Sequence, residues 1–446
     1  MSQLTTNIPS AQTGRSTHPA IPRSLTNLIL GICFLSILAD GYDLGIYGAV
    51  IPSLLNYQPW GLSAAQAGAI GSYALFGMLI GAVAIGSVTD MIGRKWTLIM
   101  CISLFSLAMA LCAMATSPEM FGLFRFIGGV GLGGVIPTAS ALTIEYSPSN
   151  RRSLNYNIMF AGYSSGIVLG AVLSIFLLQA FGWRLMFWIG ALPLLLVPLL
   201  IKYLPESVSF LLSRNRLREA EEICRKYNMD LSYFEEQRAS GEKGVGQQSK
   251  SIKGLFTKQY LGATLLIWMT YIMGFYLVYG LITWLPKIMN TLGYSLNSSL
   301  SFLLVMNLTA GIGALLAGSV ADRWGSKRVI SVSYFLAALS AFLLTLGEPP
   351  LGITYLLVGA AGFGAVGSTQ LLNAFVTKYY PPRSRATGLG WGLGAGRIGA
   401  ISGPLLIGFL LNMNIELIWS FYTFAIAGIL AMTAMLLIPS KKDEVL

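Results

Sequence analysis

Charged residues are scarce in this 446-residue sequence. Asp, Glu, Lys and Arg make up 11% of the chain, whereas hydrophobic residues make up 54%. Soluble domains carry about 25% charged residues, so this composition excludes a water-soluble enzyme. Apolar stretches of roughly 18–25 residues recur along the whole chain, and each is long enough to cross a hydrocarbon core of about 30 Å. The sequence therefore predicts an integral membrane protein.

Histidine and cysteine are also scarce. The single histidine, His18, lies in a polar N-terminal segment, so proton transfer within the membrane must depend on carboxylates. The four cysteines show no spacing typical of metal ligands, and no nucleophile–base arrangement is present. We therefore expect no metal, no cofactor and no enzymatic activity. Residues 1–24 contain no apolar run beside a cleavage site, which argues against a removed signal peptide.

The positive charges predict how the chain crosses the membrane. We expect twelve spans, at residues 25–55, 67–88, 96–116, 119–144, 153–181, 184–204, 259–286, 296–320, 329–346, 351–376, 387–411 and 416–438. Nearly all of the 29 lysines and arginines then fall between spans on one side, and only Arg184 and Lys287 lie in connections on the other. Because Lys and Arg concentrate on the cytoplasmic side, both termini are expected to be cytoplasmic. The net charge of +11 is thus explained without a nucleic-acid partner.

Two landmarks repeat at a nearly constant offset. The segment Gly86–Asp90 recurs as Gly318–Asp322, and Tyr146–Pro148 recurs as Tyr379–Pro381. A repeat in the same orientation is typical of transporters built from two equivalent halves. We predict an all-α membrane protein with twelve transmembrane helices in two six-helix halves. Its expected parts are an N-terminal tail (1–24), a first half (25–204), a central loop (205–258), a second half (259–438) and a C-terminal tail (439–446).

The pattern G-x-G-x-x-G occurs twice, at Gly129–Gly134 and Gly362–Gly367. Both copies lie inside apolar spans and neither follows a strand, so a dinucleotide-binding loop is not expected. Small residues let helix backbones approach closely in membranes, and we interpret both glycine motifs as packing sites.

Four ionisable residues lie well inside predicted spans: Asp40, Asp43, Arg125 and Arg397. Each costs roughly 2.5–3.5 kcal/mol to insert, and such residues usually mark a substrate or proton path. None has a charged counterpart at the repeat offset, so a functional role explains them better than architecture. Either aspartate is a candidate for the proton site, because a buried carboxylate beside a second one tends to take up a proton. Either arginine is a candidate for binding a carboxylate, since a planar guanidinium suits it bidentately.

Two further groups of polar residues complete the candidate site. The first group, expected to line the substrate path, comprises Asn307, Gln370, Asn373 and Trp391. The second group lies at the ends of spans on the side of the termini and is expected to form closing contacts of a gate. It comprises Asp90, Arg94 and Glu145 in the first half, and Asp322, Arg328 and Arg383 in the second.

These motifs resemble a known family. The turn Asp40-Gly41-Tyr42-Asp43 is similar to the first-span signature of the aromatic acid:proton symporters of the major facilitator superfamily, as is the glycine-rich stretch from Arg125 to Tyr146. The segments Gly86–Lys95 and Gly318–Arg328 resemble the loop motif of the whole superfamily. The resemblance covers essentially the whole chain.

The resemblance implies proton-driven import of an aromatic carboxylate such as benzoate, hydroxybenzoate, protocatechuate or gentisate. Transport would follow alternating access, with the proton as coupling ion and no other cofactor. A monomer in the inner membrane of a bacterium, in contact with lipid, is expected. An importer of nicotinate or another small carboxylate is the main alternative, and a drug exporter or a non-transporting membrane sensor fits the intramembrane arginines less well.

Overall fold

The computed structural model describes residues 21–439, except 233, 236–254, 348, 382–383 and 414. The side chains of residues 149, 314–319, 322 and 386 also lie outside the description. Within these limits, twelve helical segments are long and apolar enough to cross a membrane. The prediction of an all-α protein with twelve spans is therefore confirmed.

The first six spans follow the predicted order. They are α1 (Arg23–Leu55), α2 (Ala64–Ile92), α3 (Arg94–Met114), α4 (Pro118–Glu145), α5 (Arg152–Phe181) and a sixth made of α6 (Trp183–Gly190), a 3₁₀ turn (Leu192–Leu196) and α7 (Val197–Tyr203). The sixth span is divided because Pro193 and Pro198 lack the backbone donor that a continuous helix needs. Two short helices, α8 (Val208–Ser213) and α9 (Leu217–Lys226), follow it.

The second half repeats this arrangement. Its spans are α12 (Leu261–Thr291), α13 (Leu296–Trp324), α14 (Ser326–Leu343), α15 with α16 (Leu351–Gly362 and Ser368–Tyr379), α17 (Arg385–Asn412) and α18 (Ile418–Leu437). A π-helical turn, Phe363–Gly367, joins α15 to α16 within one span. The second glycine motif lies in this turn, where a Cβ on Gly364 would overlap the carbonyl oxygen of Ser333. Packing of neighbouring helices accounts for that motif, as expected.

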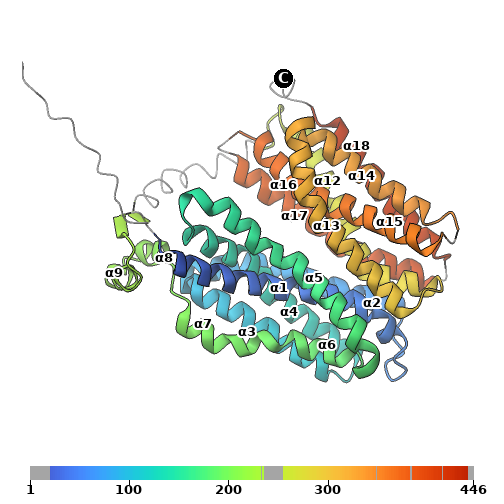
Figure 1. The fold of residues 1–446 in the computed structure, drawn as a ribbon, viewed down its shortest axis with the longest axis horizontal. Coiled ribbons are helices and arrows are strands. Elements are labelled where there is room, and N and C mark those ends of the chain that lie inside the picture. The colour runs from blue at the N-terminus through green and yellow to red at the C-terminus, as the bar shows by residue number, and fades with distance from the viewer. Residues whose placement is uncertain are drawn as a thin grey trace, which may run out of the picture.

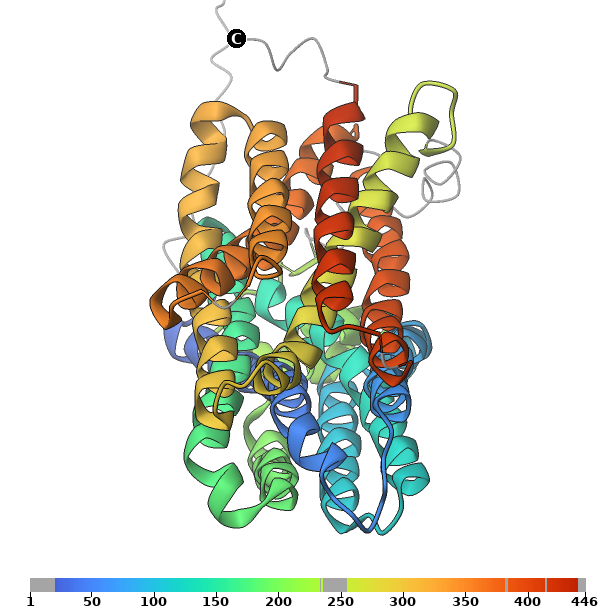
Figure 2. The ribbon, with the colours of Figure 1, turned by 90° about the vertical axis from the view of Figure 1, so that its right-hand side faces the viewer.

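The two halves meet on one side of the molecule. Figure 1 shows α1–α7 and α12–α18 as separate groups that diverge toward the ends where α1 begins and α18 ends, here called the termini side; Figure 2 shows the same division from another direction. Helix α2 packs on α17, α1 on α12 and α5 on α13. On the side opposite the termini, the Ser72 hydroxyl donates to the Ile401 carbonyl at 2.7 Å. A Cβ on Gly68 would lie 2.5 Å from the Pro404 carbonyl oxygen. The structure is therefore a conformation closed on the side opposite the termini.

Glycines place α1 directly against α5. A Cβ on Gly41 would overlap the carbonyl oxygen of Tyr163, and one on Gly45 would lie 2.9 Å from the Cα of Ile167. Because small residues allow such close approach, the backbones of α1 and α5 are fixed at this level. This contact sets the position of Asp40 and Asp43, which flank Gly41 and Tyr42 in α1.

Replacing Gly41 by alanine is expected to destabilise the first half by about 1–3 kcal/mol, because the methyl group has no room against α5. The matched control is Gly31→Ala in the same helix, where nothing lies within 4 Å of the added Cβ. Thermal unfolding of both variants in detergent measures the difference. Equal melting temperatures for the two variants would contradict the close contact.

Candidate functional site

The site begins with an ion pair between α1 and α4. Arg125 donates through Nη1 to the Asp43 carboxylate, and the two side chains are only 3% and 7% exposed. The guanidinium of Arg125 also lies over the Tyr47 ring, 4.7 Å from its centroid. Ionised groups in a membrane interior are expensive unless they are paired. The first half thus neutralises one acid and one base of the predicted site within itself.

The other two intramembrane charges have no such partner. Asp40 is 2% exposed, and its Oδ2 atom makes no hydrogen bond. Arg397 lies on α17 of the opposite half, and its buried Nη1 atom also makes no hydrogen bond. Asp40 and Arg397 are close enough to interact electrostatically, but no direct ion pair joins them. A buried donor and a buried acceptor therefore stand unsatisfied on opposite sides of the boundary between the halves.

A pocket adjoins Asp40, whereas Arg397 is not among the residues that line it. Asp40, Asp43 and Arg125 line it from the first half, together with Tyr163 of α5, and Tyr279 and Thr283 line it from α12. Apolar side chains complete the wall, among them Leu44 and Met78. The lining combines charged side chains with aromatic rings and apolar groups, which suits an amphipathic anion. Tyr163 was not expected from the sequence; its neighbours in α5, Gly162 and Gly166, signal only that this helix packs closely on another.

The structure brings none of the four predicted path residues into this pocket. Asn307 donates to the Leu303 carbonyl of its own helix at 2.9 Å, and Asn373 accepts the Tyr271 hydroxyl at 2.7 Å. Gln370 is exposed, and the exposed Trp391 stacks on Trp268 at 5.7 Å. Asn307, Asn373 and Trp391 thus contact other residues of the second half, and Gln370 is accessible at the surface. Their contribution to binding stays a prediction.

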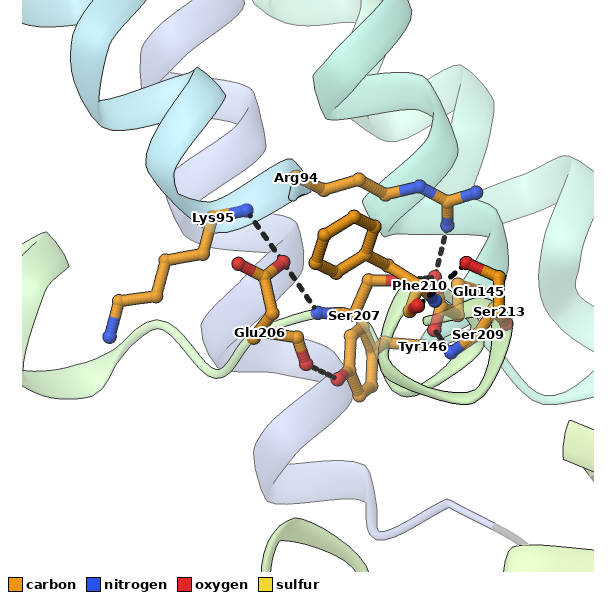
Figure 3. A network of polar contacts seen from close by, with 9 residues as sticks. All are labelled: Arg94, Lys95, Glu145, Tyr146, Glu206, Ser207, Ser209, Phe210 and Ser213. Carbon is orange, nitrogen blue, oxygen red and sulfur yellow. Dashed lines mark hydrogen bonds and ion pairs between the residues drawn. The ribbon is translucent and has the colours of Figure 1, made fainter. Parts of the chain in front are cut away.

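A polar network at the termini side joins α3, α4 and α8 (Figure 3). Glu145 accepts hydrogen bonds from Arg94, from the Ser207 hydroxyl at 2.7 Å and from the Ser209 amide at 2.9 Å. Glu206 accepts from the Lys95 amide at 3.0 Å. Burial raises the pKa of the Glu206 carboxyl, and hydrogen bonds from backbone amides partly offset this rise. The network anchors α8 to the first half.

The predicted gate residues that the structure describes lie on the termini side, where the two halves diverge in this conformation. Arg94 and Glu145 pair within the first half and do not bridge the two halves in this conformation. The Asp90 side chain is exposed, although its backbone carbonyl accepts from Arg214, and Arg328 is exposed. The side chain of Asp322 and the whole of Arg383 lie outside the described residues. Closing of a gate by these six residues stays a prediction.

Comparison with known proteins identifies the architecture. The sequence pattern of the Major Facilitator Superfamily matches residues 33–313 and 301–445. The chain belongs to the Major Facilitator Superfamily. It is similar to the partially occluded, inward-open xylose transporter XylE from E. coli, with a TM-score of 0.76 and 19% identity over 95% of this chain and all of that one. The predicted superfamily fold is confirmed.

Curated relatives cover almost the whole chain. The benzoate transport protein of Acinetobacter baylyi is 37% identical over 92% of this chain and 88% of its own. The gallate transporter of Pseudomonas putida is 37% identical over 87% and 86%. The gentisate transporter of Corynebacterium glutamicum is 35% identical over 93% and 87%. The chain is therefore a transporter and not an enzyme, a multi-pass protein of the bacterial inner membrane, and the predicted resemblance to aromatic acid transporters is confirmed.

The buried ion pair predicts a non-additive pattern of stability. Asp43→Asn or Arg125→Gln alone leaves an uncompensated charge in the membrane and should cost about 3–5 kcal/mol. The double variant removes both charges and should be clearly more stable than the sum of the two single losses implies. Thermal unfolding of the four proteins in detergent tests this, and additive losses would exclude a direct pair.

Proposed function

We propose that the protein imports aromatic carboxylates together with protons, by alternating access of one central site. The named activities of the similar proteins support the substrate class. One observation carries the mechanism: Arg397 of the second half and Asp40 of the first interact electrostatically across the boundary, and each has one buried polar atom without a hydrogen bond. An incoming anion satisfies the guanidinium, and an incoming proton neutralises the carboxyl.

Arg397 is the proposed ligand of the substrate carboxylate. Arg125 already donates to Asp43 and covers the ring of Tyr47, so an anion could bind it only by displacing Asp43. Arg397 makes no direct ion pair in this structure, and its unsatisfied N–H gains a charge-assisted hydrogen bond when a carboxylate arrives. Tyr163 and Tyr279 in the pocket wall supply aromatic surface for the substrate ring.

Asp40 is the proposed proton site. A buried carboxylate without a partner is costly in its ionised form, whereas Asp43 is compensated by Arg125. When Asp40 is ionised it attracts Arg397 and competes with the substrate; when it is protonated, Arg397 is free to bind the anion. Protonation of Asp40 therefore permits substrate binding, which is the coupling that a symporter requires.

Charge balance gives the stoichiometry of this scheme. In the empty site, Asp40 and Arg397 carry opposite charges and Asp43 compensates Arg125. In the loaded site, Asp40 is neutral and the substrate anion compensates Arg397. The site is neutral in both states, and both can cross the hydrocarbon interior without an unpaired charge. One proton thus accompanies each anion, and transport is electroneutral.

The orientation of the protein in the membrane follows from the distribution of Lys and Arg, which favours cytoplasmic termini. The halves diverge on the termini side, so the conformation described here is the one that faces the cytoplasm (Figure 1). Each chain contains both halves of the site, so a monomer suffices, and the proton is the only co-transported species.

Nicotinate is a second candidate substrate. The niacin transporter of Acinetobacter baylyi is 30% identical over 85% of this chain. Nicotinate is itself a planar aromatic carboxylate, so the Arg397 and Asp40 chemistry applies to it unchanged. Competition between nicotinate and labelled 4-hydroxybenzoate decides between the two substrates.

Proteoliposomes provide the first test. Radiolabelled benzoate and 4-hydroxybenzoate should accumulate when the outside is acidic, and a protonophore should collapse the accumulation. A potential imposed with valinomycin and potassium should change neither rate, because the loaded and empty sites are both neutral. Protein-free liposomes control for passive entry of the neutral acids. Uptake driven by the potential alone would exclude the electroneutral scheme, and absence of carrier-dependent uptake would exclude the substrate class.

Substitutions distinguish the proposed proton site, Asp40, from the proposed substrate ligand, Arg397. Asp40→Asn should abolish proton-driven accumulation but retain exchange of substrate across the membrane, because its side chain is permanently neutral. Arg397→Gln should raise KM by about tenfold or more through loss of a hydrogen bond to a charged group. Arg218→Gln, on the exposed surface of α9, is the control and should behave as the unmodified protein. Uphill accumulation by the Asp40→Asn variant would show that another residue is the proton site.

A further inference from the structure

Two tyrosines from different halves meet beside the charged site. The hydroxyl of Tyr163 donates to that of Tyr279 at 3.3 Å, and both residues line the pocket with Asp40. Tyr163 also interacts electrostatically with Asp40 and Arg397. Since α5 and α12 belong to opposite halves, this hydroxyl pair must separate whenever the halves part at this level.

Tyr163 ends a row of stacked rings on α5. The ring of Phe160 lies 6.0 Å from that of Tyr163 at an angle of 18°, and Tyr156 lies 6.2 Å from Phe160 at 12°. All three are half-buried. Their spacing of three and four residues puts them on one face of the helix, the face that Tyr163 turns toward α12.

Tyr279 ends a second row on α12. Phe275 lies 5.8 Å from Tyr279, and Tyr271 lies 6.0 Å from Phe275, with the rings inclined by 55° and 89°. This row is buried and fixed by α17, where a Cβ on Gly392 would lie 2.5 Å from the Tyr271 ring. One row is therefore held rigidly, whereas the rings of α5 keep part of their surface accessible.

Both rows of rings extend from the pocket toward the termini side. Both α5 and α12 begin on the termini side, so the rings with lower numbers lie between the pocket and that side. On the opposite side, α1 and α12 touch at Gly48, where a Cβ would overlap the carbonyl oxygen of Ile282. The tyrosine pair and the rings therefore lie between the pocket and the termini side.

We propose that Tyr163 and Tyr279 form a gate selective for planar aromatic rings, and that Phe160 binds the ring as it passes. This inference rests on the proposed function. The hydroxyl pair closes the gate between the site and the termini side. A flat ring replaces the contact between the tyrosines by offset stacking, which aromatic pairs favour at centroid distances of about 4.5–7 Å. A saturated ring of similar size has no π face and gains nothing from the row.

Cyclohexanecarboxylate tests the role of the rings, since it matches benzoate in charge and ring size but is not aromatic. Phe160→Leu should lower the rate of benzoate transport about threefold or more and leave that of cyclohexanecarboxylate unchanged, because only the stacking contribution is lost. The matched control is Phe342→Leu, whose exposed ring pairs with Tyr422 at 6.2 Å in the second half. An equal fall for both acids, or no fall, would overturn the ring site.

The hydroxyl pair is tested by a double-mutant cycle. Tyr163→Phe, Tyr279→Phe and the double variant remove the same hydrogen bond, so all three should raise benzoate exchange by the same factor of about three. Tyr276→Phe is the control, because its hydroxyl bonds Thr423 at 3.0 Å within one half. Additive effects, or the same rise in the control, would exclude the gate. If the unmodified protein carries no aromatic acid at all, the proposed function fails and not the gate alone.

Discussion

The need to neutralise charge inside the membrane governs this structure. Two acids and two bases lie deep within the described spans, and only one of each is satisfied locally, by the contact between Asp43 and Arg125. Both members of that pair belong to the first half, so a rigid-body movement of the halves does not separate them. The remaining acid and base, Asp40 and Arg397, face each other across the boundary and leave polar atoms unsatisfied. In the proposed mechanism, these unsatisfied atoms are the ones that a substrate anion and a proton satisfy.

Close packing of the helices fixes the positions of these charges. Gly41 lets α1 touch the backbone of α5, and Gly48 lets the same helix touch α12. One helix therefore positions both aspartates, contacts the partner half and closes the pocket on the side opposite the termini. A relative movement of the halves must change the contact at Gly48 but not the one at Gly41. The proposed proton site, Asp40, would thus move together with α5 of the first half.

The sequence was sufficient for the architecture and for the identity of the intramembrane charges. The twelve spans follow from apolar length, and the two halves follow from the repeated segments. The pairing could not be predicted, because Asp40 and Asp43 share one helix face and either could reach an arginine. Packing of α1 on α5 and α4 places Asp43, and not Asp40, in contact with Arg125. The hydrogen bonds between Glu145 and α8 could not be predicted either, because Ser207 and Ser209 come near Glu145 only through the path of the chain after α7.

The lack of repetition among the charges has a consequence for how substrate specificity can change. The two halves share their helices and their loop landmarks, whereas Asp40 and Asp43 lie in the first half and Arg397 in the second. In the proposed mechanism, energy coupling therefore belongs to the first half, whereas recognition of the substrate is shared, with Arg397 and Tyr279 from the second half and Tyr163 from the first. Substitutions along α12 and α17 can diversify the molecules carried while the proton machinery stays untouched. With this arrangement, substrate specificity could change while the proton coupling that drives transport is kept.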